Sequence, residues 1–246
     1  RAVLDVLSGR NYLIVRNTGN TLKKSCWNEI WKAISLFKLN QYFDASKSDM
    51  TITCNLNDKQ ILFSGLDDVE KVKSITPIKG ALTDIWIEEG TEVNYEDYKQ
   101  LRKRLRGYSK HSKRITISFN PIYQTHWIYT EFFGDWEDNK NLYENDNLLI
   151  LKTTHKDNEF LSQDDHDELE NEKDPYYYQV YTLGNWGVLG DRIFTNWHVE
   201  DLSVPVKVLK AGQEIEMPLY QTFDNIRTGL DFGFAQDPSA FIKLNF

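Results

Sequence analysis

The sequence predicts an α/β protein whose main sheet is largely parallel and covered by helices on both faces. Three observations lead to this class. Short apolar runs alternate with segments of helical periodicity over the first 150 residues, which is the pattern of a parallel sheet. The apolar runs are nearly continuous, as in strands buried on both faces. With 40% hydrophobic and 27% charged residues, the 246 residues suffice for one large domain, or for one domain and part of a second.

The first half of this pattern begins with the apolar run 12–16, which ends at a polar segment and predicts a buried strand. Apolar residues then recur every three or four positions over 22–37 and predict an amphipathic helix. The runs 50–54 and 61–63 flank a turn-rich segment and predict a hairpin. A polar helix is expected near 68–74.

The next elements carry the residues of chemical interest. The strand over 82–87 runs directly into two glutamates. It is followed by a basic helix over 95–106, a strand over 115–119, a helix over 126–133 and a further strand over 148–151, all assigned to the same sheet and its covering helices.

The pattern changes after residue 153. A charged helix is expected over 162–172 with Ser162 as its cap, and an aromatic helix over 176–183. From residue 204 onward the sequence is β-rich. Glycines punctuate the chain at 184, 187 and 190, and we place a boundary near residue 200.

Composition excludes several classes of protein. No apolar run approaches 18 residues, so no transmembrane helix is expected, and no signal peptide is recognisable. The two cysteines, Cys26 and Cys54, cannot form a disulfide framework, and we expect both to be buried free thiols. The chain begins at Arg1 and not at Met, so we expect it to be a fragment.

Charge is unevenly distributed although the net charge is only −8. The 33 residues from Tyr98 to Thr130 contain eight lysines and arginines and no acid, whereas residues 131–175 contain fifteen acids and four lysines. The basic stretch can bind phosphate despite the global sign, or it can form a solvated face that pairs with the acidic stretch.

The strand over 82–87 delivers Glu88 and Glu89 at its carboxyl end, where ligands bind in parallel α/β sheets. A Walker B strand uses this arrangement: one acid holds Mg²⁺ and the next orients the water that attacks ATP. The alternative is a strand that simply enters a solvated loop. The following strand ends in Ser118 and Asn120, which place a hydroxyl and an amide at the same edge and could sense a phosphate, or could form an Asn-Pro turn.

Two further observations bear on chemistry. No G-x-x-x-x-G-K-[ST] motif occurs, so these residues alone should bind ATP poorly. Asp231 lies in a short strand near the C-terminus, where metal-dependent nucleases place an acid that bridges two Mg²⁺ or Mn²⁺ ions, although it could equally be a strand-end turn residue. The histidines form no metal-binding motif.

The order of these features resembles the large terminase subunit of tailed bacteriophages and prophages. The segments that carry the resemblance are 12–18, 63–74 with its Phe-Ser-Gly-Leu-Asp-Asp start, 85–92, 104–107, 118–127, 157–161, 184–187 and 229–238. They span nearly the whole chain.

The resemblance implies a P-loop-NTPase-like ATPase core over residues 1–152, a helical lid or linker over 153–200, and the first strands of an RNase H-like nuclease over 201–246. Glu88 matches the metal-associated acid and Glu89 the catalytic acid. Ser118 and Asn120 fall in the motif that couples hydrolysis to movement, and Asp231 matches the first nuclease carboxylate. The P-loop of the family lies upstream of the strand that contains Arg16, and the nuclease is cut off after its first hairpin.

The implied activity is ATP-driven translocation of double-stranded DNA into procapsids, with metal-dependent cleavage of concatemers. The implied cofactors are ATP with Mg²⁺, and Mg²⁺ or Mn²⁺ for the nuclease. The implied partners are DNA, a small terminase subunit, the portal protein and further copies in a ring, in the cytoplasm of an infected or lysogenic bacterium, with no membrane association. Two alternatives remain: a non-catalytic prophage remnant, or another P-loop ATPase of helicase type with a DNA-binding module.

Overall fold

The computed structural model describes residues 1–67, 72, 74–187, 203–210, 212–223, 226–231 and 240–245, with the side chains of residues 20, 230, 231 and 240–245 excepted. The chain divides into two compact units, Arg1–Asp191 and Arg192–Phe246. The predicted fold class is confirmed, because the first unit is built on a mainly parallel sheet with helices on both faces. The predicted boundaries of the core, lid and nuclease segments stay predictions.

The central sheet has six strands in the order β2-β3-β4-β1-β5-β6. Four of them run parallel: β1 (Tyr12–Arg16), β4 (Lys59–Gly65), β5 (Asp84–Glu88) and β6 (Arg114–Ser118). At one side β3 (Thr51–Cys54) pairs antiparallel with β4, and β2 (Phe43–Ser46) pairs antiparallel with β3. The β3–β4 pairing confirms the predicted hairpin, whereas β2 was not expected from its sequence.

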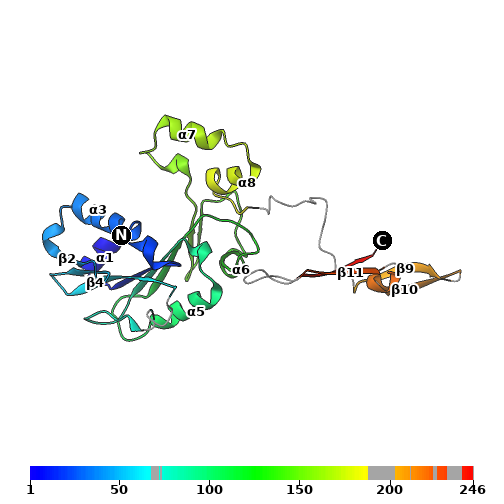
Figure 1. The fold of residues 1–246 in the computed structure, drawn as a ribbon, viewed down its shortest axis with the longest axis horizontal. Coiled ribbons are helices and arrows are strands. Elements are labelled where there is room, and N and C mark those ends of the chain that lie inside the picture. The colour runs from blue at the N-terminus through cyan, green and yellow to red at the C-terminus, as the bar shows by residue number, and fades with distance from the viewer. Residues whose placement is uncertain are drawn as a thin grey trace. The chain divides into compact units, whose positions relative to one another are not determined.

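Helices cover the two faces of this sheet, with α3 (Cys26–Leu36) on one side and α5 (Tyr95–Arg104) on the other (Figure 1). Alternate residues of β1 enter different cores: Tyr12 and Ile14 pack with α3 and with α1 (Ala2–Leu7), whereas Leu13 and Val15 pack with α5. Both faces are therefore dry, which explains why β1 is apolar at four consecutive positions.

An ion-pair network closes the amino-terminal ends of the strands. The Asp84 carboxylate, 3% exposed, accepts hydrogen bonds from Arg10 Nε at 2.7 Å and from Arg114 Nε at 2.6 Å. Arg114 also contacts Asp5 at 2.5 Å, and Tyr12 donates its hydroxyl to the same Asp5 oxygen. Burial competes with hydrogen bonds from Tyr12 and Arg114, and these bonds hold the pKa of Asp5 below its ordinary value.

Two predicted elements differ from the structure. The helix predicted over 22–37 is present as α3 but begins four residues later, because a turn at Lys23–Ser25 separates it from the short α2 (Gly19–Leu22). The strand predicted for the central sheet over 148–151 was placed wrongly. It is β8 (Leu149–Leu151), which pairs antiparallel with β7 (Leu142–Glu144) outside that sheet. The Asn145 side-chain oxygen accepts hydrogen bonds from the backbone amides of residues 147 and 148, which stabilises the turn between β7 and β8.

The rest of the first unit follows β6. It begins with α6 (Trp127–Phe132) and continues through β7 and β8 to α7 (Gln163–Glu170), whose predicted Ser162 cap is confirmed by a capping box with Asp165. The predicted aromatic helix is a short α8 (Pro175–Tyr177) that continues as a π-helix over Tyr178–Thr182. Residues 68–71 and 73 of the polar helix expected near 68–74 lie outside the described residues.

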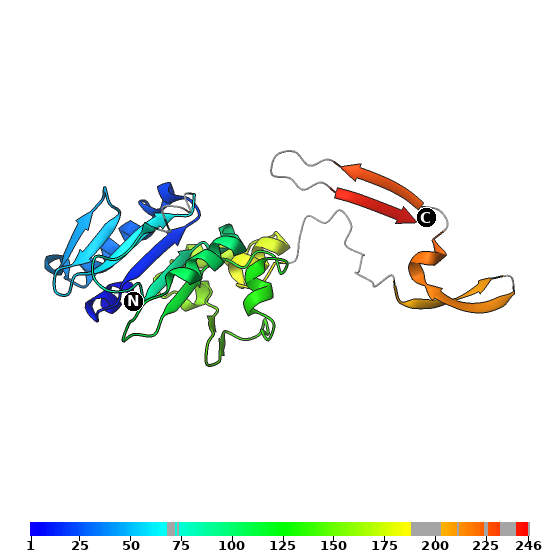
Figure 2. The same ribbon diagram turned by 90° about the horizontal axis from the view of Figure 1, so that it is seen from below.

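The second unit contains two hairpins, which Figure 2 shows from below. One joins β9 (Pro205–Lys210) to β10 (Gln213–Pro218), and the other joins β11 (Ile226–Asp231) to β12 (Ala240–Asn245). The predicted β-rich character of this region is confirmed. In the described parts of the chain, no helix is both long and apolar enough to cross a membrane.

Candidate active site

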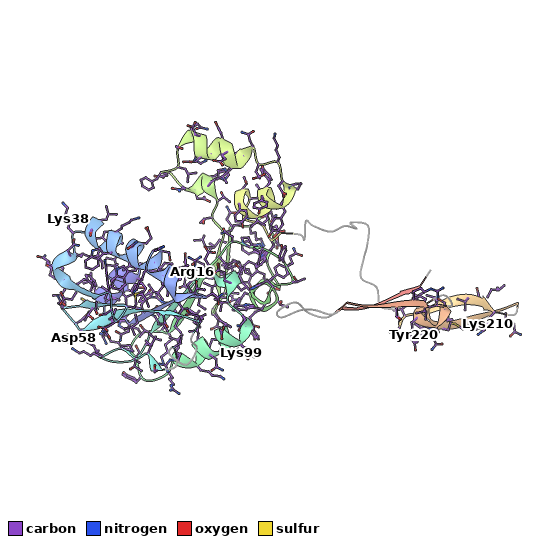
Figure 3. All side chains as sticks on the ribbon, in the orientation of Figure 1. Arg16, Lys38, Asp58, Lys99, Lys210 and Tyr220 are labelled. Atoms are coloured by element: carbon purple, nitrogen blue, oxygen red, sulfur yellow. The ribbon has the colours of Figure 1, made fainter. Side chains whose placement is uncertain are left out.

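The carboxyl ends of the four parallel strands form the edge that bears the predicted site. The register brings Arg16 beside Gly65 and Glu88 beside Ser118, and it pairs Val15 with Ile87 one residue earlier. Parallel strands end at one edge of a sheet, so four separate segments of sequence meet here. Figure 3 labels Arg16 and Asp58 at opposite ends of the sheet. The glutamate pair follows β5 at the same end as Arg16, because β1 and β5 run parallel.

Glu88 and Ser118 are in direct contact. The Ser118 hydroxyl donates a 2.5 Å hydrogen bond to Glu88 Oε2 and accepts a 2.7 Å bond from the indole Nε1 of Trp86. The Trp86 and Glu88 side chains share one face of β5 because they are two residues apart on a strand. The sequence reasoning missed Trp86, although this spacing could have indicated that its indole lies beside the carboxylate.

Glu89 has an unusual backbone conformation. Its φ of 52° and ψ of 55° place a non-glycine residue in the left-handed region, at a cost on the order of 1 kcal/mol. The next residue must be Gly90, since an added Cβ would lie 2.2 Å from Ile117 Cγ2. The turn is thus pressed against β6 and points the Glu89 carboxylate away from the direction that a continued strand would give it.

The surroundings of this turn raise the pKa of the Glu89 carboxyl group. Burial is the main cause that raises the pKa of Glu89, and the nearby Glu88 and Glu92 carboxylates raise it further while Arg16 opposes them. A carboxylate whose pKa is raised in this way is a better proton acceptor than a solvated one, as general bases require.

Arg16 supplies positive charge beside these acids. Its Nη2 lies 3.6 Å from Glu92 Oε1, and its Nε is buried with no hydrogen-bond partner in the described part of the chain. An unsatisfied buried donor is costly, which is often a sign that a group absent from the structure binds there. An anion at this edge would satisfy it.

Asn120 follows β6 and is exposed, and its side chain makes no hydrogen bond within the described residues. The preceding Phe119 instead packs inward, with its ring centroid 5.5 Å from that of Trp186 and 6.2 Å from that of Phe133. Trp186 is 4% exposed, so the end of β6 is joined through aromatic contacts to the segment that closes the first unit.

A second contact fixes this junction. Tyr123 forms a parallel bridge with Gly187, and its ring lies 5.6 Å from that of Tyr176 at the start of α8. A Cβ at Gly187 would lie 2.3 Å from the Ile122 carbonyl oxygen and 2.4 Å from the Tyr176 ring. Only glycine permits this approach, so the segment after β6 packs directly against α8 at this point.

Two further expectations concern metal ions and the second unit. Among the described residues, no three His, Cys, Asp or Glu side chains are arranged to hold a metal ion. Asp231 ends β11, where its backbone pairs with Ala240, but its side chain lies outside the described residues. Cys26 and Cys54 are free and buried, as predicted.

Comparison with known proteins decides the family. A family model described as phage terminase large subunit matches residues 3–185. This chain belongs to the phage terminase large subunit family. The expectation drawn from the order of its sequence segments is therefore confirmed.

Curated relatives extend the match beyond the family model. The chain is 29% identical over 248 residues to the PBSX phage terminase large subunit of Bacillus subtilis (strain 168), covering 96% of this chain and 54% of that protein. It is 27% identical over 243 residues to the terminase large subunit of Bacillus phage SPP1, covering 96% of this chain and 53% of that protein. The chain thus spans about half the length of these relatives.

Solved structures share the fold. The large terminase of a thermophilic bacteriophage superposes with a TM-score of 0.59 at 18% identity, over 99% of this chain and 54% of that one. A second structure of that protein, in complex with ATP-gamma-S, gives a TM-score of 0.55 at 17% identity, over 99% of this chain and 54% of that one.

Proposed function

We propose that this chain is part of an ATP-driven motor that moves double-stranded DNA into procapsids and cuts DNA concatemers with a metal-dependent nuclease. One observation carries the ATPase part of this proposal. A glutamate pair ends a buried parallel strand, and the first glutamate is hydrogen-bonded at 2.5 Å to a serine at the end of the neighbouring strand. Membership of the terminase family supports the interpretation of this glutamate pair as part of an ATPase site.

In this proposal Glu89 is the catalytic base and holds the attacking water. Two features support that role: the pKa of Glu89 is raised, and its left-handed backbone turns the side chain at the carboxyl end of β5. A general base needs a basic carboxylate that is positioned near the reacting water. The buried Arg16 Nε, which has no partner in the described residues, would bind a nucleotide phosphate oxygen at the same edge.

Glu88 would hold Mg²⁺. The donor set fits, since Mg²⁺ prefers hard oxygen ligands and is usually bound by one or two carboxylates together with phosphates and water. When bound, the ion neutralises charge on the phosphates. Ser118 orients the Glu88 carboxylate through its hydrogen bond, and Phe119 connects the same strand end to Trp186. We propose that Ser118 and Asn120 transmit hydrolysis to the lid along this route.

The 246 residues contain no phosphate-binding loop motif, so we propose that residues outside this sequence supply it and that this chain alone turns over ATP poorly. The thermophilic-phage large terminase solved with ATP-gamma-S supports ATP as the nucleotide. For the nuclease we propose Asp231 as one ligand of Mg²⁺ or Mn²⁺. The proposed partners are DNA, a small terminase subunit, the portal protein and further copies in a ring, in the cytoplasm of the bacterial host.

The experiment uses the full-length protein that contains this chain. Glu89→Gln should lower ATP hydrolysis by about 10²- to 10⁴-fold and abolish packaging while DNA cleavage persists. Asp231→Ala should abolish cleavage and preserve ATP hydrolysis. Glu96→Gln, the same substitution on the exposed start of α5, is the control and should change neither activity. Loss of both activities in a folded single variant would contradict the division of labour, and full ATP turnover by Glu89→Gln would contradict the proposed site.

A further inference from the structure

The loop that joins α5 to β6 is rigidly anchored yet presents unpaired cations. Lys113 Nζ donates to the carbonyl oxygens of Leu105 at 3.1 Å and Gly107 at 2.6 Å, and Arg10 Nη2 donates to that of Ser112 at 2.5 Å. Arg106 and Lys110 remain exposed between these anchors, and in the described chain neither side chain makes an ion pair or hydrogen bond.

This loop lies at the amino-terminal edge of the sheet, where other lysines gather. Burial lowers the pKa of Lys59, and the neighbouring Lys79 and Lys110 lower it further. Lys79 forms an ion pair with Asp58 at 2.8 Å. This one acid compensates only part of the positive charge of Lys59, Lys79 and Lys110. Like charges held together without full compensation raise the energy of the free protein and favour an anionic partner.

The same loop exposes an aromatic side chain. Tyr108 is 92% exposed, and among the described large apolar side chains only Phe160 is more exposed, at 96%. Tyrosine and arginine are enriched at the centres of protein interfaces, and Arg106 lies beside Tyr108 on this loop. We call Arg106, Tyr108 and Lys110 the basic end of the unit.

Phe160 belongs to a surface of opposite charge. It precedes α7, where Asp164 and Glu168 lie one turn apart on one face, exposed and without ion pairs among the described residues. Like charges at this spacing destabilise a helix by about 0.2–0.5 kcal/mol. We call Phe160, Asp164 and Glu168 the acidic end.

The acidic end is anchored as firmly as the basic end. At the end of α7, Glu170 accepts from Lys156 Nζ at 2.8 Å and contacts His155 Nε2 at 3.1 Å. Thr182 Oγ1 donates to the Leu169 carbonyl oxygen at 2.8 Å. The helix therefore holds Asp164 and Glu168 outward on a fixed support.

The two ends cannot meet within one chain. Residues 105–113 lie where the parallel strands begin, next to α5, and Figure 1 shows α5 and α7 on opposite sides of the sheet. Two complementary surfaces at opposite ends of one unit can pair only between copies. Such a contact is heterologous, and it produces a ring when the rotation between copies closes.

We propose that the basic end of one copy binds the acidic end of a second copy, with Tyr108 and Phe160 packing at the centre of a head-to-tail contact. This inference deepens the proposed self-assembly of the motor and rests on the proposed function. It names the contacting surfaces of the chain, of which the family assignment says nothing.

The test exchanges the charges of the two ends. Arg106→Glu with Lys110→Glu makes both ends acidic, and Asp164→Lys with Glu168→Lys makes both ends basic. In sedimentation velocity at about 50 mM salt, each double variant should associate with itself at least 10-fold more weakly than wild type. An equimolar mixture of the two variants should restore association, because each altered end then meets a complementary one. Lys38→Glu with Lys47→Glu changes the same charge elsewhere and should leave association within about 2-fold.

A second measurement locates the contact. Tyr108→Cys and Phe160→Cys chains, mixed and oxidised, should form a disulfide-linked heterodimer, whereas neither chain alone should form a dimer; the native cysteines are buried. Wild-type chain that stays monomeric up to about 100 μM, or a mixture without rescue, would overturn the proposal. The proposal would also be overturned if Arg106→Glu with Lys110→Glu abolished binding of a 25-base-pair duplex and left self-association unchanged. That surface would then be a DNA contact. The proposed function can fail separately. If head-to-tail association is observed but Glu89→Gln leaves ATP turnover of the full-length protein intact, the proposed function is refuted and the proposed surfaces are not.

Discussion

The hydrogen bond between Ser118 and Glu88 gives the most direct test of the site geometry. Ser118→Ala removes a 2.5 Å bond to a carboxylate, which is worth about 1.5–3 kcal/mol when a charged group takes part. It also removes the acceptor of the Trp86 indole N–H at 2.7 Å. Because Trp86 and Ser118 are only part-buried, water can replace some of this loss, and we expect a destabilisation of about 2 kcal/mol.

Urea unfolding followed by circular dichroism would measure this loss. With a slope of about 2 kcal/mol per molar urea, the midpoint should fall by roughly 1 M. A double-mutant cycle with Glu88→Ala should give a coupling energy of about 1–2 kcal/mol. Thr116→Ser, an exposed position on the same strand, is the control and should stay within about 0.5 kcal/mol of wild type. A loss below about 0.5 kcal/mol for Ser118→Ala, or strict additivity in the cycle, would refute the argument.

Two further predictions concern charge. The folded state disfavours the charged form of Glu89, so its pKa is raised above the ordinary value of 4.5. Glu89 therefore destabilises the protein increasingly as pH rises from 4.5 to the raised pKa, and by a constant amount at higher pH. Glu89→Gln should therefore raise the melting temperature at pH 8 but not at pH 3.5, and an equal effect at both pH values would contradict this. Asp84→Ala leaves the buried Arg10 and the half-buried Arg114 without their shared acid and should cost about 3–5 kcal/mol in urea unfolding, so a cost under 1 kcal/mol would show that the network is dispensable.

Local patterns were sufficient to predict the main elements of the first unit. Strands such as Tyr12–Arg16 are apolar at four positions in succession because both faces of the sheet are dry, and that pattern can be read without a structure. The Ser162 cap was likewise evident because capping depends on residues within one turn. The strand at Leu149–Leu151 was misplaced because three apolar residues do not say which strand will pair with them.

By itself the sequence determined the fold class, the family, the position of the glutamate pair at a strand end, and the segregation of basic and acidic stretches. These depend on periodicity, motif order and composition, which are local or additive along the chain. Only the tertiary structure decided that Trp86 and Glu88 share Ser118, and that Asp84 joins arginines 74 and 30 residues away. It also decided that the unpaired charges lie at opposite ends of one unit. Such relations depend on which side chains meet across the sheet, and sheet register sets those meetings rather than neighbouring sequence.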